Sequence, residues 1–516
     1  MPISVSRSSA NSRFSRLANV IGPSAPHLTL FTICLLLLLY GYEIFNFSLS
    51  IDEEAYGSDF WLVVIANGRW ATGLLARAFP PLGSIPMIST LMFCAGLGVS
   101  ACVLGRVLFR NHSAQLAFVG IFVSSPLWPH LAEFNISSWC VGIGCVLLTL
   151  ALLLFLAEDR LGDVWVACLL AFATGISESF FVWFLVLLCV LHLSVLLGTA
   201  TAGVTEARQK FPWLRSGLIA GGGLLGYLAM QRLVLAAFSL KLDTYVKGFM
   251  RLEDFIRVPA RALSQTLLRC WKLLSGTDPI YLGYGHVLTL LSLLGLLIVV
   301  IRLLRRGPLS SLQRLMGGAI LVAALGLALS PILVSAGTAP VRAFFPWIPM
   351  SAFLAGVTLT HSGRFKTPLY FVLSAALFIS IWISVSLFYT DHLVRQRDQL
   401  LAARIMARVD QILPNPPPGQ IPFVVVGGPP ARDEDSFRKI EIFGDSYFDL
   451  AHEGGNPYRI AAYLRLLGVN NLEPHLLEDA AHLRPVIEAM PVWPAAGSVA
   501  IVSGMLVIKL GPTPPA

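Results

Sequence analysis

Three consecutive acids, Asp52, Glu53 and Glu54, follow the first strongly apolar segment of this 516-residue chain and precede the tripeptide Gly68-Arg69-Trp70. At the end of a membrane-spanning helix, carboxylates lie at or just outside the bilayer surface, where they ionise without the full cost of desolvation. A carboxylate placed there could act as a general base on a hydroxyl group. The same acids could instead be a solvated helix cap. The residue types alone leave both interpretations open.

Positive charge that could meet a phosphate is found in two places. Arg342 lies in the segment PVRAFFPWIP, and its planar guanidinium group suits phosphate oxygens. Arg69 could contact the same kind of ligand. The alternative is that Arg342 extends along apolar surface to reach the membrane interface and that Arg69 anchors a surface helix.

Four further residues are candidates for substrate binding. Tyr56 and Trp70 could stack on sugar rings, although aromatic residues also gather at membrane interfaces by default. Glu133 and Glu178 could complete an acidic site or simply cap helices. His130 lies only three residues before Glu133, which is a weak metal-binding pattern, so we expect no cofactor and no tightly bound metal, with a divalent ion as the alternative.

The composition indicates a polytopic membrane protein. Hydrophobic residues make up 56% of the chain and charged residues 13%, which no soluble globular surface would tolerate. The net charge of +8 arises from short basic clusters between apolar segments, as the positive-inside rule requires. The charge therefore reports membrane topology, and we expect no nucleic-acid partner.

The hydropathy pattern predicts about eleven transmembrane helices within residues 28–388. A cytoplasmic tail at 1–27 precedes them, and an odd number of spans places the C-terminus outside the cytoplasm. Outer loops are expected at 48–84, 129–139 and 239–285. The predicted spans are 28–47, 85–105, 114–128, 140–156, one ending just before Ser177, 180–198, 217–238, 286–301, 315–334, 345–360 and 368–388.

Two outer segments are amphipathic rather than uniformly apolar. Residues 59–79 predict a helix lying in the interface, because Asn67, Arg69 and Arg77 interrupt the apolar run. The loop 239–285 alternates charged and apolar residues and is basic, which predicts surface helices suited to anionic head groups.

Residues 389–516 lose the membrane character and predict a small extracytoplasmic α/β domain. An apolar stripe from Val394 to Ile412 predicts a helix that ends at the PNPPPGQ break. Strands are expected at 422–427, 499–502 and 506–510, and helices at 457–467 and 476–490.

Four segments follow one another in a distinctive order: SIDEE followed by NGRW, the turn PVRAFFPWIP, the helix DHLVRQRDQLLAARI and the tail segment FGDSYFDLAHEGGNPYRIAAYLRLLG. This order is similar to that in the Gtr type II family of integral-membrane, serotype-converting O-antigen glucosyltransferases, which are GT-C-like. Many relatives carry two aspartates where this chain has Asp52-Glu53, which leaves open which carboxylate is the base.

The resemblance implies transfer of a sugar, expected to be glucosyl, from a polyprenyl-phosphate donor to a cell-surface glycan such as O-antigen. It also implies a location in the bacterial inner membrane, with the reaction on the outer face. Asp52 or Glu53 would be the catalytic base. Arg342 and Arg69 would bind the donor phosphate. The expected partners are the lipid-linked donor, the glycan acceptor and the bilayer.

Two other functions fit many of the same features. A transporter or flippase of a lipid-linked sugar would also need many spans, but the chain has no evident internal repeat, and its charges gather near the surface rather than at the midplane. A glycan polymerase would use a similar donor. The three functions differ in their products. A glucosyltransferase adds one sugar residue, a polymerase extends a glycan chain, and a transporter or flippase does neither.

Overall fold

The computed structural model describes residues 26–55, 60–79, 85–157, 160–201, 204, 213–243, 248, 250–305, 309–415, 419–429, 440–448 and 456–513. The chain divides into two compact units. One, here called the membrane unit, comprises residues 1–45 and 59–385, and the other, here called the tail unit, comprises residues 46–58 and 386–516. The boundary at Val385 lies close to the predicted one. The acidic loop, however, belongs to the tail unit, which the sequence did not predict.

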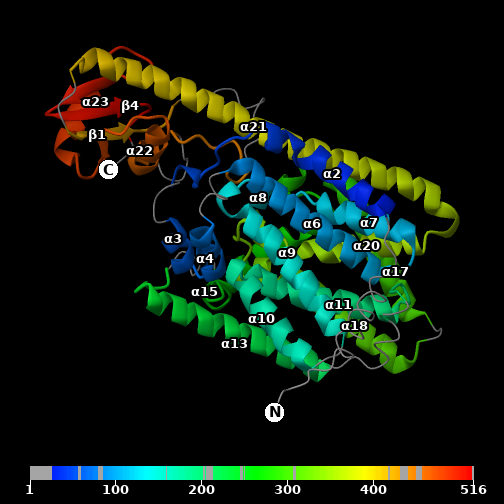
Figure 1. Cartoon of the computed structure of the whole chain (residues 1–516). Coiled ribbons are helices and arrows are strands. Elements are labelled where there is room, and N and C mark those ends of the chain that lie inside the picture. The colour runs from blue at the N-terminus through cyan, green and yellow to red at the C-terminus, as the bar shows by residue number, and fades with distance from the viewer. Residues whose placement is uncertain are drawn as a thin grey trace. The chain divides into compact units, whose positions relative to one another are not determined.

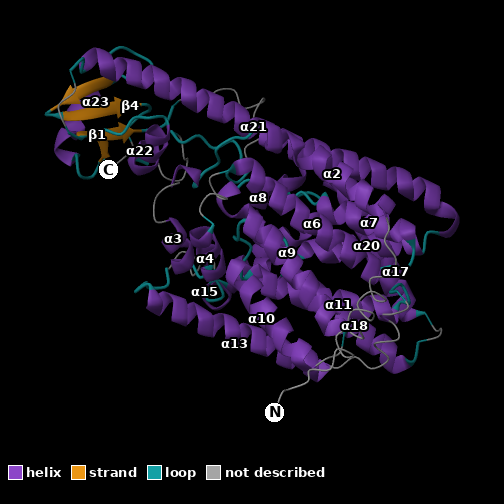
Figure 2. Cartoon of the chain, viewed as in Figure 1, coloured by secondary structure: helices purple, strands orange, loops and turns teal. Residues whose placement is uncertain are grey.

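The membrane unit is built from helices (Figures 1 and 2). The α-helices among its described residues are α2 (Pro26–Phe45), α3 (Phe60–Ala66), α4 (Trp70–Ala78), α6 (Pro86–Leu108), α7 (His112–Val123), α8 (Pro129–Ala132), α9 (Asn135–Leu156), α10 (Arg160–Ile176), α11 (Ser179–Leu196), α13 (Trp213–Ala237), α15 (Asp254–Arg257), α16 (Pro259–Ser275), α17 (Gly285–Leu304), α18 (Ser311–Ala328), α19 (Ser330–Val334), α20 (Trp347–Thr360) and the first part of α21 (Lys366–Ile412).

Eight of the described helices are long and apolar enough to cross a membrane, and α7, α10 and α20 are shorter apolar helices. These eleven helices coincide with the eleven predicted segments. Apolar helices of this kind satisfy their backbone hydrogen bonds internally, which is what a bilayer requires. The predicted interfacial helix at 59–79 is instead two short helices, α3 and α4, separated by Gly68, whose φ of 89° favours glycine.

Close helix packing forms the centre of the membrane unit. Helices α6 and α9 approach so closely at Gly96 and Gly142 that a Cβ atom on Gly96 would lie 2.2 Å from the Gly142 carbonyl oxygen. Small residues at such crossings allow the two backbones into contact, which maximises van der Waals packing between membrane helices.

The tail unit contains a four-stranded sheet with the strand order β2-β1-β4-β3. Strand β1 (Ile421–Val426) pairs in parallel with β2 (Leu472–Pro474) and β4 (Met505–Lys509), and β3 (Val499–Val502) forms an antiparallel hairpin with β4. The predicted strands of β1, β3 and β4 are confirmed, whereas β2 was missed because it is only three residues long.

Helices cover both faces of this sheet. Ile421, Phe423 and Val425 of β1 pack with α22 (Pro457–Leu466) and the end of α21, while Val424 and Val426 pack on the opposite face with α23 (Arg484–Ala489). Alternate side chains of a strand point to opposite faces, so an unbroken apolar strand fits a sheet buried on both sides. The predicted helix at 457–467 is confirmed; the one at 476–490 is shorter, comprising a 3₁₀ turn and α23.

Candidate functional site

The acidic loop is held in the tail unit by an arginine on α22. Arg459 forms ion pairs with Asp52 at 3.0 Å and with Glu54 at 2.5 Å. Asp52 adopts a φ of 77°, an uncommon left-handed conformation for a residue with a side chain. Such conformations persist where the surroundings hold them in place, and they cluster at functional sites. Because the loop and α22 belong to one folded unit, they must occupy the same compartment.

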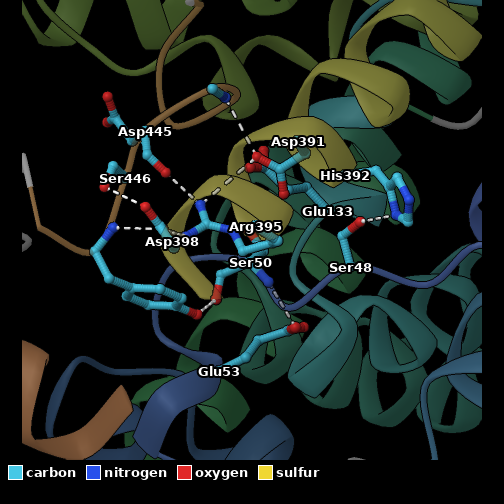
Figure 3. Close-up of polar contacts among 12 residues, drawn as sticks. Ser48, Ser50, Glu53, Glu133, Asp391, His392, Arg395, Asp398, Asp445 and Ser446 are labelled. Atoms are coloured by element: carbon cyan, nitrogen blue, oxygen red, sulfur yellow. Dashed lines mark hydrogen bonds and ion pairs between the residues drawn. The ribbon is translucent and has the colours of Figure 1, made fainter. Parts of the chain in front are cut away.

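A second set of contacts fixes the backbone of this loop. The Ser50 amide donates to Glu53 Oε2 at 2.9 Å, and the Tyr447 hydroxyl donates to the Ser50 carbonyl. The Tyr447 ring stacks on Tyr463, with centroids 4.3 Å apart. The loop is thus anchored to the body of the tail unit through both main-chain and side-chain groups (Figure 3).

Only one of the three acids is accessible. Glu53 is fully buried and Glu54 is 7% exposed, whereas the Asp52 side chain is 40% exposed. Burial raises the pKa of Glu54 above its ordinary value, and the nearby Arg459 only partly opposes this effect. The interpretation of these acids as a solvated cap is therefore wrong for Glu53 and Glu54, because packing against the tail unit removes them from water. Asp52 is the carboxylate best placed to meet a hydroxyl group of an incoming molecule.

A buried arginine connects α21 with the segment 444–447 (Figure 3). Arg395 forms ion pairs with Asp398 at 2.7 Å and Asp391 at 3.8 Å, and it donates to the Asp445 carbonyl oxygen. Asp398 in turn accepts from the Tyr447 amide at 3.0 Å, and the guanidinium group of Arg395 lies 4.3 Å from the Tyr447 ring centroid. A buried charge network of this kind fixes one arrangement of its elements, here the position of Tyr447 beside the acidic loop.

Sequence reasoning did not single out Arg459, Arg395 or Tyr447 as site residues. The signal was present, since all three fall in the two tail segments, DHLVRQRDQLLAARI and the one beginning FGDSYFDL, that carry the family resemblance. The sequence could not show that Arg459 contacts Asp52, because the two residues are 407 positions apart in the chain.

In the membrane unit, Arg69 and Glu178 face each other. Arg69 Nε lies 3.9 Å from Glu178 Oε2, and the two side chains are 43% and 36% exposed. The neighbouring Gly68 accepts a hydrogen bond from the Tyr227 hydroxyl at 3.3 Å, and a Cβ atom there would lie 3.0 Å from the Glu178 carboxylate. The contact is therefore long and its two side chains are partly exposed, while the backbone beneath it is closely packed.

Arg342 lies in a 3₁₀ turn, η3 (Val341–Phe344), with its guanidinium carbon 5.2 Å from the centroid of the Phe134 ring. The adjacent Ala343 carbonyl accepts from the Ser179 hydroxyl at 3.5 Å. This bond links the turn carrying Arg342 to the residue next to Glu178. The membrane unit therefore pairs Arg69 with Glu178 and links the turn that carries Arg342 to the residue after Glu178, and Phe134 places Glu133 next to the same turn.

His130 and Glu133 are both buried on and beside α8. Burial, aided by the nearby Arg342, lowers the pKa of His130 to about 3, so the imidazole is neutral at physiological pH. Among the described residues there is no group of three or more His, Cys, Asp and Glu side chains that could hold a metal ion.

Of the two aromatic residues predicted to stack on sugar rings, Trp70 lies within the described residues. Trp70 is 3% exposed and packs edge-on against Phe172, with centroids 5.6 Å apart, so its ring lies inside the helix bundle. This burial agrees better with a packing role than with stacking on a ligand. Tyr56 lies outside the described residues.

Long apolar helices together with a small C-terminal sheet are typical of an integral membrane protein. The family of glucosyl transferase GtrII matches residues 41–360, which is more than half of the chain. The chain therefore belongs to the GtrII glucosyl transferase family and is a membrane glycosyltransferase. The matched residues include the acidic loop and Arg342 but not the α/β part of the tail unit. No match was found among the curated proteins or the solved structures.

Proposed function

We propose that this enzyme transfers a glucosyl group from a polyprenyl-phosphate donor to a cell-surface glycan such as O-antigen. The observation that carries the proposal is the placement of Asp52, Arg69 and Arg342 within the region that defines a glucosyltransferase family. A lipid-linked donor fits a protein whose helices are apolar enough to lie in a bilayer.

Two chemical roles follow from this proposal. Asp52 accepts the proton of the acceptor hydroxyl as that oxygen attacks the anomeric carbon, and the bond from this carbon to the phosphate oxygen breaks. Arg342, with Arg69 beside Glu178, stabilises the negative charge that remains on the polyprenyl phosphate. Because Arg342 is already positioned over Phe134, little side-chain freedom would be lost when the phosphate binds.

The direct test is transfer by purified protein in proteoliposomes supplied with radiolabelled polyprenyl-phosphate glucose and a lipid-linked glycan acceptor. Addition of one labelled residue per acceptor is expected. Growth of a glucose polymer would indicate a polymerase, and movement of labelled lipid across the bilayer without transfer would indicate a flippase. Either result would overturn the proposal.

We further propose that the reaction takes place on the outer face of the bacterial inner membrane, with the N-terminus in the cytoplasm and the tail unit outside it. The short basic clusters between apolar segments support this orientation. Reporter fusions after Glu54 and at the C-terminus should both give extracytoplasmic signals. A cytoplasmic signal at either position would reject the orientation.

A further inference from the structure

Helix α16 of the membrane unit presents three different faces along its length. Ala262, Thr266 and Leu273 are buried and attach the helix to its own unit. Next to this face, Leu263, Leu267 and Trp271 follow one another at intervals of four residues, so they form a single stripe. Their exposed fractions are 52%, 59% and 65%. A row of large exposed apolar side chains marks a surface that contacts a membrane or another protein.

The remaining face of α16 is mainly polar and basic, with one exposed leucine, Leu268, among its polar residues. Arg261, Gln265 and Lys272 recur at helical spacing on the side away from the apolar stripe. A helix with one apolar and one basic face lies in the membrane interface, with its apolar side chains in the acyl boundary and its cations among the head groups. Helix α16 thus confirms an amphipathic helix within the loop 239–285, and its position at the membrane surface stays a prediction.

A hollow of about 260 Å³ opens beside this basic face. It is lined by Arg251, Asp254, Val258, Arg261, Ala262, Gln265 and Thr338. These residues offer two guanidinium groups, a side-chain amide and a hydroxyl group. Across the described part of the chain, neither Arg251 nor Arg261 forms an ion pair, whereas the nearby Arg257 pairs with Glu253 at 2.9 Å. Asp254 is the one acid among the described lining residues, so positive charge prevails in the hollow.

The geometry points to a phospholipid site: Arg251 and Arg261 bind the phosphate of an anionic glycerophospholipid while the stripe Leu263, Leu267 and Trp271 enters the acyl boundary. Phosphate oxygens accept from guanidinium groups in a fork-like arrangement, and the Gln265 amide can donate to a further head-group oxygen, whereas the Thr338 hydroxyl already donates to the Ser335 carbonyl at 2.7 Å. A bilayer lipid satisfies the charge of the hollow and the apolar stripe at once, which a free phosphate does not. The inference does not depend on the proposed glucosyl transfer.

The site can be tested with the full-length protein in nanodiscs that contain a photoreactive phosphatidylglycerol. Cross-links are expected within residues 250–275. Because each basic residue near an anionic surface contributes about 1 kcal/mol, Arg251→Gln and Arg261→Gln should each reduce labelling of this segment about fivefold. The matched control is Arg257→Gln, which removes an arginine of the same segment that is exposed and paired, and which should leave labelling unchanged.

Three results would overturn the inference: labelling that is indifferent to Arg251 and Arg261, an equal loss in Arg257→Gln, or displacement of the probe by polyprenyl phosphate at concentrations where added phosphatidylglycerol has no effect. The last result would assign the hollow to the donor. A second measurement avoids variants that fail to fold. In the unaltered protein, a phosphatidylcholine probe of the same photochemistry should label the segment at least fivefold less, and equal labelling would reject the site.

Discussion

The arginines of the two units are held in opposite ways. In the tail unit, Arg459 makes two short ion pairs, one of them with the buried Glu54, and its own side chain is only 24% exposed. In the membrane unit, Arg69 lies 3.9 Å from a partner that is itself partly exposed, and Arg342 rests on an aromatic ring.

This difference separates two kinds of role. An arginine whose donors are already engaged with buried carboxylates holds those carboxylates in place, since removing it would leave a charge without compensation. An arginine in a loose, solvent-exposed arrangement can redirect its donors to a ligand at little cost. This comparison supports a role for Arg459 in positioning the acidic loop, and it is compatible with the proposed contact between the partly exposed Arg69 and the donor.

The largest effect is expected from Asp52→Asn, which keeps the shape of the side chain but removes the basic oxygen. Turnover should fall roughly 10²-fold or more, with little change in donor KM, because general-base catalysis contributes about this much. The measurement is steady-state transfer in proteoliposomes.

Glu488→Gln is the matched control for this change. Glu488 is an acid of the same unit that pairs with Arg484 at the surface, and its side chain is 54% exposed. Near-normal transfer by both Asp52→Asn and Glu53→Gln would remove the acidic loop from catalysis and direct attention to Glu133 or Glu178.

Arg342→Ala should lower kcat/KM for the donor roughly tenfold to a hundredfold, because a hydrogen bond to a charged group is worth about 1.5–3 kcal/mol. Arg342→Lys should recover part of this loss, as it keeps the charge without the planar fork. Arg364→Ala is the control, since Arg364 is also stacked near a phenylalanine, 5.1 Å from the Phe365 ring, but is exposed. Equal losses in Arg342→Ala and Arg364→Ala would mean that Arg342 only anchors the protein.

Arg459→Met should destabilise the acidic loop by about 2 kcal/mol, since Glu54 would be left buried without its partner. Turnover should fall with it, whereas Arg459→Lys should be milder. Hydrogen exchange of residues 46–55 in the full-length protein measures the effect. Arg465→Met, on the exposed side of the same helix, should change neither exchange nor turnover. Unchanged exchange in Arg459→Met would contradict a positioning role.

The last prediction concerns the pH dependence of stability, which leaves turnover at neutral pH unchanged. The pKa of His130 is about 3 in the folded protein and about 6.5 when unfolded, so the unfolded chain binds more protons between these values and stability falls as the pH drops through this range. The loss at pH 5 should be about 2 kcal/mol. His130→Gln should remove this part of the pH dependence, as seen in unfolding temperatures at pH 7.5 and pH 5. An unaltered pH dependence in the variant would show that His130 is not the responsible group.

Much of the architecture was determined by the sequence. The eleven apolar segments predicted the apolar helices because a run of about 20 apolar residues is long enough to span a bilayer. Such a run forms a helix that satisfies its own backbone hydrogen bonds, so the prediction does not depend on neighbouring segments. The strands β1, β3 and β4 and the helix at Pro457 were also predicted, since apolar runs and turn residues mark them within a few positions.

Tertiary structure alone decided which acid is exposed. Asp52, Glu53 and Glu54 are neighbours of nearly equal chemistry, and the sequence left open which of them is accessible. Packing of the loop against Tyr447 and α22 buries two of them and leaves Asp52 open. The accessibility and pKa of a carboxylate depend on what surrounds it, and here the surrounding groups come from some 400 residues further along the chain, where no local pattern could reveal them.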